Sequence, residues 1–311
     1  MGCTFCATGT MGLMSNLTAG EILEQVAHAN KIEKIRNVVF MGMGEPLDNY
    51  KQVLAAASGM MDVSRFSLSP ARISISTVGV VPRILNLIQD LPQVGLAISL
   101  HAPNQELRSQ IVPTSKAWHI SKIMAATDAF IANQNKDSSK NRKKHIMIEY
   151  VLIANINDSV DCARELGLLL QGKEILLNVI PYNPTKVPFD YKSPSQESID
   201  KFVETVRSYS VHTILRQGTL YPFLIFLELG QDIASACGQL VVETGKLCST
   251  SKDMEDLVKP LNESSKRITV KKRTKESISQ DLVSPSNTYP YALAFICLVL
   301  ALRITWRFIE N

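Results

Sequence analysis

Two cysteines close to the N-terminus have the type and spacing that most directly indicate chemistry. Cys3 and Cys6 stand two residues apart in the run Met1-Gly-Cys-Thr-Phe-Cys-Ala-Thr-Gly9. Thiolates with this spacing can bind one metal centre, form a redox pair or pack as unrelated core thiols. A structural zinc site needs four ligands, usually two such pairs, and an iron–sulfur cluster with one iron open to substrate needs three thiolates. The remaining cysteines are single: Cys162, Cys237, Cys248 and Cys297.

Helical and strand patterns alternate along the chain, which is typical of an α/β protein with a parallel sheet and crossover helices. The capping box Thr18-Ala-Gly-Glu21 predicts a helix that runs to about Ile35. Strands are predicted at 38–41, 73–78, 94–100, 146–152 and 175–180. Further helices are predicted at 120–132, 160–170 and 196–209.

Several residues with ligand-binding character lie at the ends of the predicted strands. In barrels and open α/β sheets, ligands bind beyond the carboxyl ends of the strands. The Gly44-Glu45 turn lets backbone approach a ligand and offers a carboxylate to an ammonium group, although it could also be a tight bend. His101 could be a structural histidine, and Asn183 could merely fix its turn. On pattern alone, Ser76, Ser99 and Leu100 would be ordinary strand residues. The residues at these strand ends are Gly44, Glu45, Ser76, Ser99, Leu100, His101 and Asn183.

Taken together, these motifs and the run Ala236-Cys-Gly-Gln-Leu240 resemble one family of enzymes. The family is that of the radical S-adenosylmethionine (SAM) methyltransferases that methylate C2 of an adenine in large-subunit ribosomal RNA. The likeness covers residues 1 to about 217 and 230 to about 250, in family order, through five separate motifs. A related class methylates C8 of the same kind of base and shares much of the pattern.

The resemblance implies a fold, two cofactors and a set of site residues. The fold would be a partial (β/α)6 TIM-like barrel, and Cys3 and Cys6 would ligate a 4Fe-4S cluster. The candidate strand-end residues would bind SAM. Cys237 would accept a methyl group from one SAM before a second SAM is cleaved to a radical that activates this S-methyl group. The implied partners are ribosomal RNA, transfer RNA as in relatives, and an electron donor such as flavodoxin or ferredoxin.

The chain also departs from the family pattern. The family motif is C-x-x-x-C-x-x-C, and its first cysteine would lie four residues before Cys3, upstream of Met1. The N-terminal accessory domain, the first barrel strand and a second catalytic cysteine would also lie upstream, so we expect an N-terminally truncated core at 1–248. Within this core, residues 218–229 form an apolar insert that the family lacks, and we interpret it as aberrant.

Composition favours an enzyme core with an appended tail. The chain has 311 residues, 45% hydrophobic and 20% charged, enough for one large domain. Its net charge of +4 permits an RNA partner without requiring one. Residues 249–287 read as a polar, basic, disordered tail. The apolar segment at 288–311 contains an uninterrupted run, 292–302, that is too short to span a membrane, so no firm membrane partner is expected.

Six cysteines without a signal peptide indicate a reducing compartment. We expect the cytoplasm, or a plastid if a transit peptide preceded the chain. Two other classes of protein compete with the methyltransferase. One is a catalytically inactive RNA-binding fragment of the same family, because the first cluster cysteine is not in the chain. The other is a small zinc or redox protein built on the single cysteine pair.

Overall fold

The computed structural model describes residues 1–13, 15–136, 144–184 and 187–215. Within them, six strands form one sheet in chain order: β1 (Val38–Phe40), β2 (Ile73–Thr77), β3 (Gly95–Ser99), β4 (Ile146–Leu152), β5 (Ile175–Pro181) and β6 (His212–Leu215). The helices are α1 (Ala19–Ile32), α2 (Tyr50–Met61), α3 (Val81–Asp90), α4 (Gln105–Ile111), α5 (Ile120–Gln134), α6 (Val160–Leu170) and α7 (Gln196–Ser208). Short 3-10 turns lie at η1 (Thr8–Met11), η2 (Pro70–Arg72) and η3 (Pro113–Ala117).

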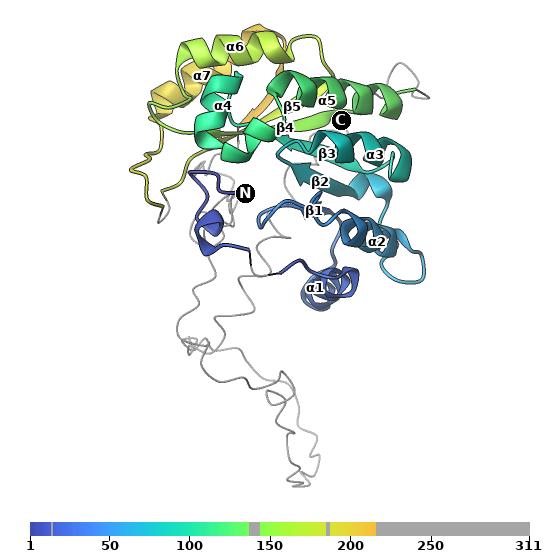
Figure 1. The fold of residues 1–311 in the computed structure, drawn as a ribbon. Coiled ribbons are helices and arrows are strands. Elements are labelled where there is room, and N and C mark those ends of the chain that lie inside the picture. The colour runs from blue at the N-terminus through green and yellow to red at the C-terminus, as the bar shows by residue number, and fades with distance from the viewer. Residues whose placement is uncertain (14, 137–143, 185–186, 216–311) are drawn as a thin grey trace, which may run out of the picture. The chain divides into compact units, whose positions relative to one another are not determined.

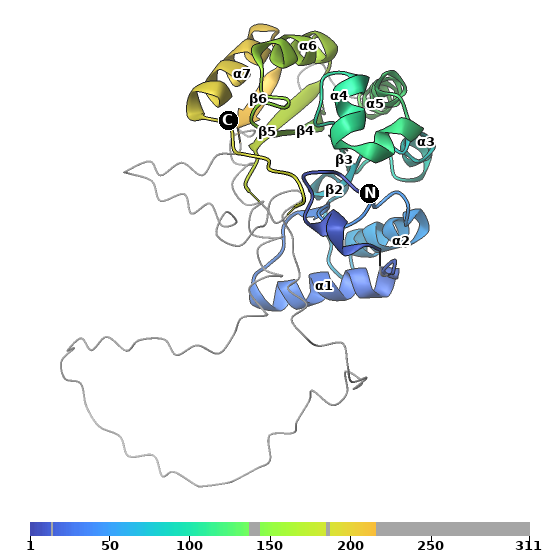
Figure 2. The same ribbon diagram turned by 60° about the vertical axis from the view of Figure 1, so that its left-hand side comes forward.

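Every neighbouring pair of strands is parallel, and each strand pairs with the next one along the chain. Figures 1 and 2 show helices along one side of the sheet and the N-terminal segment on the other. This is the arrangement of a partial (β/α)6 barrel, as the sequence predicts. All carboxyl ends of the strands therefore lie at one edge, where the candidate residues are expected to meet.

The four central strands, β2 to β5, bury most residues on both of their faces, with different chemistry on each. Alternate residues such as Ile75, Ile98 and Ile148 belong to the main apolar core together with residues of α2, α3, α5, α6 and α7. Because successive side chains of a strand point to opposite faces, the intervening residues point inward. Several of these inward residues are polar and buried: Ser76, Ser99, Glu149 and Asn178. The inner face is thus polar close to the strand ends, where a barrel binds its ligands.

The helix starts follow the capping chemistry that the sequence indicates. The Thr18 side chain accepts from the Glu21 backbone, and the Glu21 carboxylate accepts from Thr18 N at 2.7 Å, which completes the predicted capping box. The helix ends at Ile32 rather than near Ile35, because Glu33 is already extended at φ −146° and ψ 140°. The predicted strand 146–152 and helix 160–170 are confirmed with the same bounds.

The sixth strand differs from the sequence prediction. The expected count of six relied on a strand upstream of Met1, whereas β6 (His212–Leu215) completes six strands within the described residues. This strand is only four residues long and has an exposed first residue, so it lacks the apolar run by which the other strands were predicted. Its parallel register with β5, for example Asn178 opposite Ile214, makes it a strand.

Several predictions concern residues outside the described ranges: Cys237, Cys248, the insert at 218–229, the tail at 249–287 and the segment at 288–311. Among the helices that the structure describes, none is both long and apolar enough to cross a membrane.

Candidate functional site

The loop that carries Cys3 and Cys6 is fixed to the barrel by its intervening residues. Thr4 N donates to the carbonyl of Ile111 at the end of α4 (3.0 Å), and the Tyr191 hydroxyl donates to Thr4 Oγ1 (2.8 Å). Within the loop, Cys6 N donates to Cys3 O (3.1 Å). The loop is therefore a short turn held between α4 and the segment after β5.

Phe5 is the anchor of this loop and joins it to a predicted cofactor-binding residue. Its ring is buried, and it packs in a second apolar cluster with Val151, Ile153 and Tyr182. The Phe5 ring lies edge-on to the His101 imidazole, with 5.0 Å between ring centroids. The cysteine motif and the segment after β3, about 100 residues apart in the sequence, are thus in direct contact.

The two thiols are half-buried and free. Burial, with the neighbouring Cys6, raises the pKa of the Cys3 thiol to about 11, so it is protonated at neutral pH unless a metal displaces the proton. The Cys6 sulfur accepts a hydrogen bond from Gly9 N at 3.3 Å. No group of three or more His, Cys, Asp or Glu residues suited to a metal occurs among the described residues. The loop therefore offers two thiols, where a site-differentiated cluster needs three thiolates.

The turn after β1 is tied to the end of β2 by the Glu45 carboxylate. Its Oε1 accepts from Leu47 N and its Oε2 from Val78 N, each at 2.9 Å. Burial raises the pKa of Glu45 despite these two amide donors. Gly44 has a φ of +72°, a backbone conformation that favours glycine. Glu45 thus shapes the turn, and any ligand contact would use the remaining lone pairs or the turn backbone.

Ser76 and Ser99 point at each other on the inner face of the sheet. Their hydroxyl oxygens are 3.3 Å apart, and both side chains are buried. Ser99 lies opposite Glu149 in the β3–β4 register, and Glu149 lies opposite Asn178 in the β4–β5 register. Glu149 and Asn178 were missed in the sequence, although single polar residues at inward positions of apolar strands were the signal that could have identified them.

His101 is a neutral, fully buried histidine in a strained turn. Its backbone has a φ of +61°, and its Nδ1 accepts from Val151 N at 3.1 Å, which places the ring proton on Nε2. Burial, with the nearby Arg108 charge, lowers the pKa of His101 to about 3. The ring can therefore donate through Nε2 but does not become a proton carrier at neutral pH.

The His101 turn is held by Asn157, which the sequence analysis also missed. Asn157 is fully buried, and its Nδ2 donates to the carbonyls of His101 (2.8 Å) and Val151 (2.7 Å). Its Oδ1 accepts from Ile153 N at 2.6 Å. This one side chain therefore connects the ends of β3 and β4.

The two other predicted residues occupy different surroundings. Leu100 is buried in the main apolar core, so its side chain faces the helices. Its N–H donates to Glu149 O and its carbonyl accepts from Arg108 Nε, each at 3.0 Å. Asn183 follows β5 by two residues and is half-buried. The structure thus brings the Cys3–Cys6 loop, His101 and the Ser76–Ser99 pair to the same sheet edge. Asn183 lies after β5, two strands away from β3 in the sheet.

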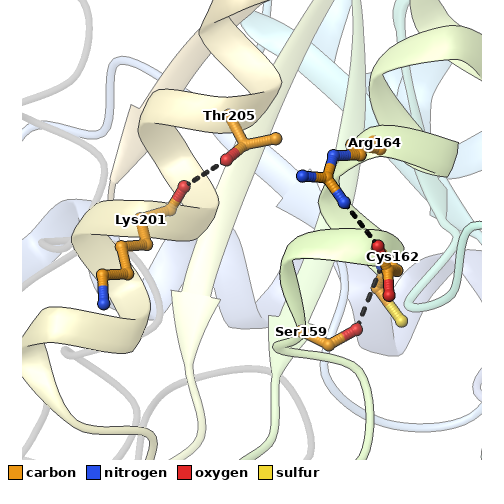
Figure 3. A network of polar contacts seen from close by, with 6 residues as sticks. Ser159, Cys162, Arg164, Lys201 and Thr205 are labelled. Carbon is orange, nitrogen blue, oxygen red and sulfur yellow. Dashed lines mark hydrogen bonds and ion pairs between the residues drawn. The ribbon is translucent and has the colours of Figure 1, made fainter.

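A cavity of about 530 Å³ lies between the starts of α6 and α7 and contains none of these residues. Ser159 and Lys201 are among its lining residues. Figure 3 shows this region, with the N-cap Ser159 accepting from Cys162 N at 3.1 Å and the Arg164–Asp161 ion pair on the same helix. Cys162 thus belongs to the start of α6, and it lies outside the cluster of candidate residues.

The family model of the Radical SAM superfamily matches residues 1–159. The chain belongs to this superfamily, in agreement with its parallel partial barrel and its cysteine loop. A crystal structure of a radical SAM methyltransferase from Sphaerobacter thermophilus superposes with a TM-score of 0.67 at 37% identity, covering 76% of this chain and 66% of that one.

Relatives of known name identify the family to which the chain belongs within this superfamily. A probable dual-specificity RNA methyltransferase RlmN of Carboxydothermus hydrogenoformans is 41% identical over 77% of this chain and 65% of its own length. RlmN 1 of Myxococcus xanthus is 39% identical over 77% and 63%, respectively. RlmN of Vesicomyosocius okutanii is 36% identical over 82% of this chain and 67% of its own length. The chain belongs to the RlmN family of dual-specificity RNA methyltransferases and spans somewhat less than two thirds of the first two relatives.

Proposed function

We propose that this chain is the core of a radical SAM enzyme that methylates C2 of an adenine in ribosomal RNA, and also in transfer RNA. The observation that best supports the proposal is the edge-on contact of Phe5 with His101. It joins the loop whose cysteines would hold a cluster to a segment that would hold SAM. Members of the RlmN family are named as dual-specificity RNA methyltransferases, which supports two RNA substrates.

In this proposal Cys3 and Cys6 hold two corners of a 4Fe-4S cluster, and a third thiolate would complete the ligand set. When bound, the cluster and SAM supply one-electron chemistry, with an electron from a donor such as flavodoxin or ferredoxin. Glu45 and Asn157 hold their turns in shape through the hydrogen bonds given above. The SAM-binding residues are Gly44, Glu45, Ser76, Ser99, Leu100, His101 and Asn183.

Cys237 is proposed as the methyl carrier. One SAM would methylate the Cys237 sulfur, and a hydrogen atom would then be removed from this S-methyl group so that its carbon can bond to C2 of the adenine. The bond between that carbon and the Cys237 sulfur would break when a second cysteine resolves the protein–RNA adduct and the C2 proton leaves. This indirect route is needed because the ring carbon is too weak a nucleophile to attack SAM directly. The reaction would take place in the cytoplasm, or in a plastid if a transit peptide lies upstream.

The test uses residues 1–311 without 218–229, preceded by the N-terminal segment of the Carboxydothermus relative; we call this protein the extended chain. Cys237→Ala in the extended chain should abolish 2-methyladenosine formation in RNA and leave iron and sulfide content unchanged. Cys162→Ala serves as a matched control and should retain both. Mass spectrometry of the RNA and of the Cys237 peptide gives the readout. Methylation retained by Cys237→Ala, or 8-methyladenosine as the product, would refute the assignment.

One observation favours a second candidate, a catalytically inactive RNA-binding fragment. Only two cluster thiolates are present among the described residues. An inactive fragment would bind RNA while forming no 5′-deoxyadenosine from SAM after reduction. A zinc protein would instead contain zinc and no acid-labile sulfide.

A further inference from the structure

Arg108 is a completely buried arginine beneath the candidate site. It lies on α4, and its side chain has no exposed surface. Its Nε donates to Leu100 O (3.0 Å), and its Nη2 donates to Val78 O (2.5 Å) and Ser99 O (3.2 Å). The guanidinium therefore holds together the ends of β2 and β3, where SAM is proposed to bind.

The charge of Arg108 has no counter-charge among the described residues. None of their carboxylates forms an ion pair with it, and its Nη1 is buried without a hydrogen-bond partner. Burial lowers the pKa of Arg108 only to about 10, so the group stays cationic at neutral pH. An unpaired buried charge is costly, and proteins normally supply an anion for it. The three carbonyls satisfy hydrogen bonds but carry no net charge.

The Cys3 loop lies next to this uncompensated charge. Thr4 N and Thr4 Oγ1 both donate to Ile111 O, one turn further along the helix that carries Arg108. Cys3 packs in the same apolar cluster as Leu107 and Ile111 of that helix. The same cluster includes Val78, whose carbonyl accepts from Arg108 Nη2.

We propose that Arg108 is the counter-charge of the thiolate-ligated cluster at Cys3 and favours its reduced state. This inference rests on the proposed function. Reduction adds one electron from the flavodoxin-type donor and so makes the cluster more negative by one charge. A fixed cation in a poorly hydrated site stabilises the more negative state, because Coulomb interactions are strong there. Cluster potentials depend on net charge and solvent exposure.

A purely structural clamp would behave differently. The three carbonyl contacts need only N–H donors, which a neutral side chain can supply in part. The effect of charge can therefore be separated from the effect of shape by comparing a charged replacement with neutral ones. Arg108→Lys keeps the charge but loses the planar fork of donors. Arg108→Gln keeps a donor without the charge, and Arg108→Met keeps the length without either.

The experiment measures the cluster midpoint potential of the anaerobically reconstituted extended chain, by EPR-monitored titration without SAM. Both neutral variants should have a more negative potential than the parent, and Arg108→Lys should stay close to it. Arg164→Met removes an exposed cation of α6 as a control and should leave the potential unchanged. If one neutral variant fails to fold, as judged by circular dichroism, the other decides.

An unchanged potential in a folded neutral variant overturns the inference. If such a variant also binds SAM more weakly, then Arg108 pairs with the carboxylate of SAM rather than with the cluster. An equal shift in Arg108→Lys and in the neutral variants would likewise overturn it, because shape rather than charge would then set the potential. A parent protein that takes up no iron and sulfide refutes the proposed function itself, which the Arg108 comparison by itself does not do.

Discussion

Buried polar side chains, more than exposed ones, shape this site. Asn157 and Arg108 donate hydrogen bonds to backbone carbonyls at the ends of neighbouring strands, and the Glu45 carboxylate accepts from a backbone N–H there. A buried polar group left without its partner costs about 1–3 kcal/mol, so each of these contacts fixes one loop against the next. The loops at the strand ends are therefore positioned by hydrogen bonds within the chain itself.

His101 should make the protein sensitive to acid. Its pKa is about 3 in the fold and about 6.5 when unfolded, so the unfolded chain binds more protons between these values. Its contribution to the free energy of unfolding is complete above about pH 6.5 and is lost as the pH falls towards 3. The magnitude is a few kcal/mol, at about 1.36 kcal/mol per pKa unit.

Urea denaturation between pH 4 and 7 measures this effect. The stability difference between wild type and His101→Asn should grow with pH, since Asn tolerates the positive φ but does not titrate. Parallel pH profiles for wild type and His101→Asn would contradict the prediction.

Glu45 should change the pH dependence of the free energy of unfolding in the opposite direction to His101. Burial raises its pKa in the folded state, so its contribution is greatest below the unfolded pKa of about 4.3 and is lost as the pH rises through the raised value. The difference in free energy of unfolding between wild type and Glu45→Gln should therefore fall as the pH rises. Glu197→Gln is the control, because the pKa of the exposed Glu197 is lowered by Lys201. If this difference instead rises with pH for Glu45→Gln, the pKa of Glu45 is not raised in the folded state.

At the scale of elements, two helical glycines should respond oppositely to alanine. A Cβ on Gly167 of α6 would lie 2.4 Å from Cδ2 of the Tyr209 ring, whereas on Gly20 of α1 the nearest atom is Thr18 Oγ1 at 3.9 Å. Gly167→Ala should cost about 1–3 kcal/mol through overpacking. Gly20→Ala should gain up to about 1 kcal/mol from helix propensity. Thermal denaturation measures the change in stability for both variants. A stabilising Gly167→Ala would show that α6 and α7 are not packed this closely.

The elements that the sequence predicted well are those with a strong periodic pattern. The mostly apolar run of β4 (Ile146–Leu152) and the apolar stripe of α6 (Val160–Leu170) were predicted from end to end. The four residues of β6 have no such run, and only pairing with β5 makes them a strand. Short elements depend on tertiary contacts, which local sequence does not contain.

The same distinction applies to the site. Strand-end positions of Ser99 and His101 follow from the α/β pattern, because parallel strands end at one edge. Arg108 lies in a seven-residue helix among polar neighbours and looks like a surface residue in the sequence. Which carbonyls it reaches, up to 30 positions away, depends on how α4 packs beneath the strand ends.

At the scale of the whole molecule, the distribution of cluster ligands leads to the last prediction. The described residues supply two thiolates on one loop, and a cluster with an open iron needs three. The 311-residue chain, reconstituted alone, should therefore retain clearly fewer than about four irons and four sulfides and lose them quickly in air. The extended chain should retain about four of each, and mutating its upstream cysteine should return it to the level of the shorter chain. Iron and sulfide assays after gel filtration measure this.

Full retention by the shorter chain would show that a residue outside the described ranges, such as Cys237 or Cys248, completes the ligand set. Cys237→Ala and Cys248→Ala would then identify which one.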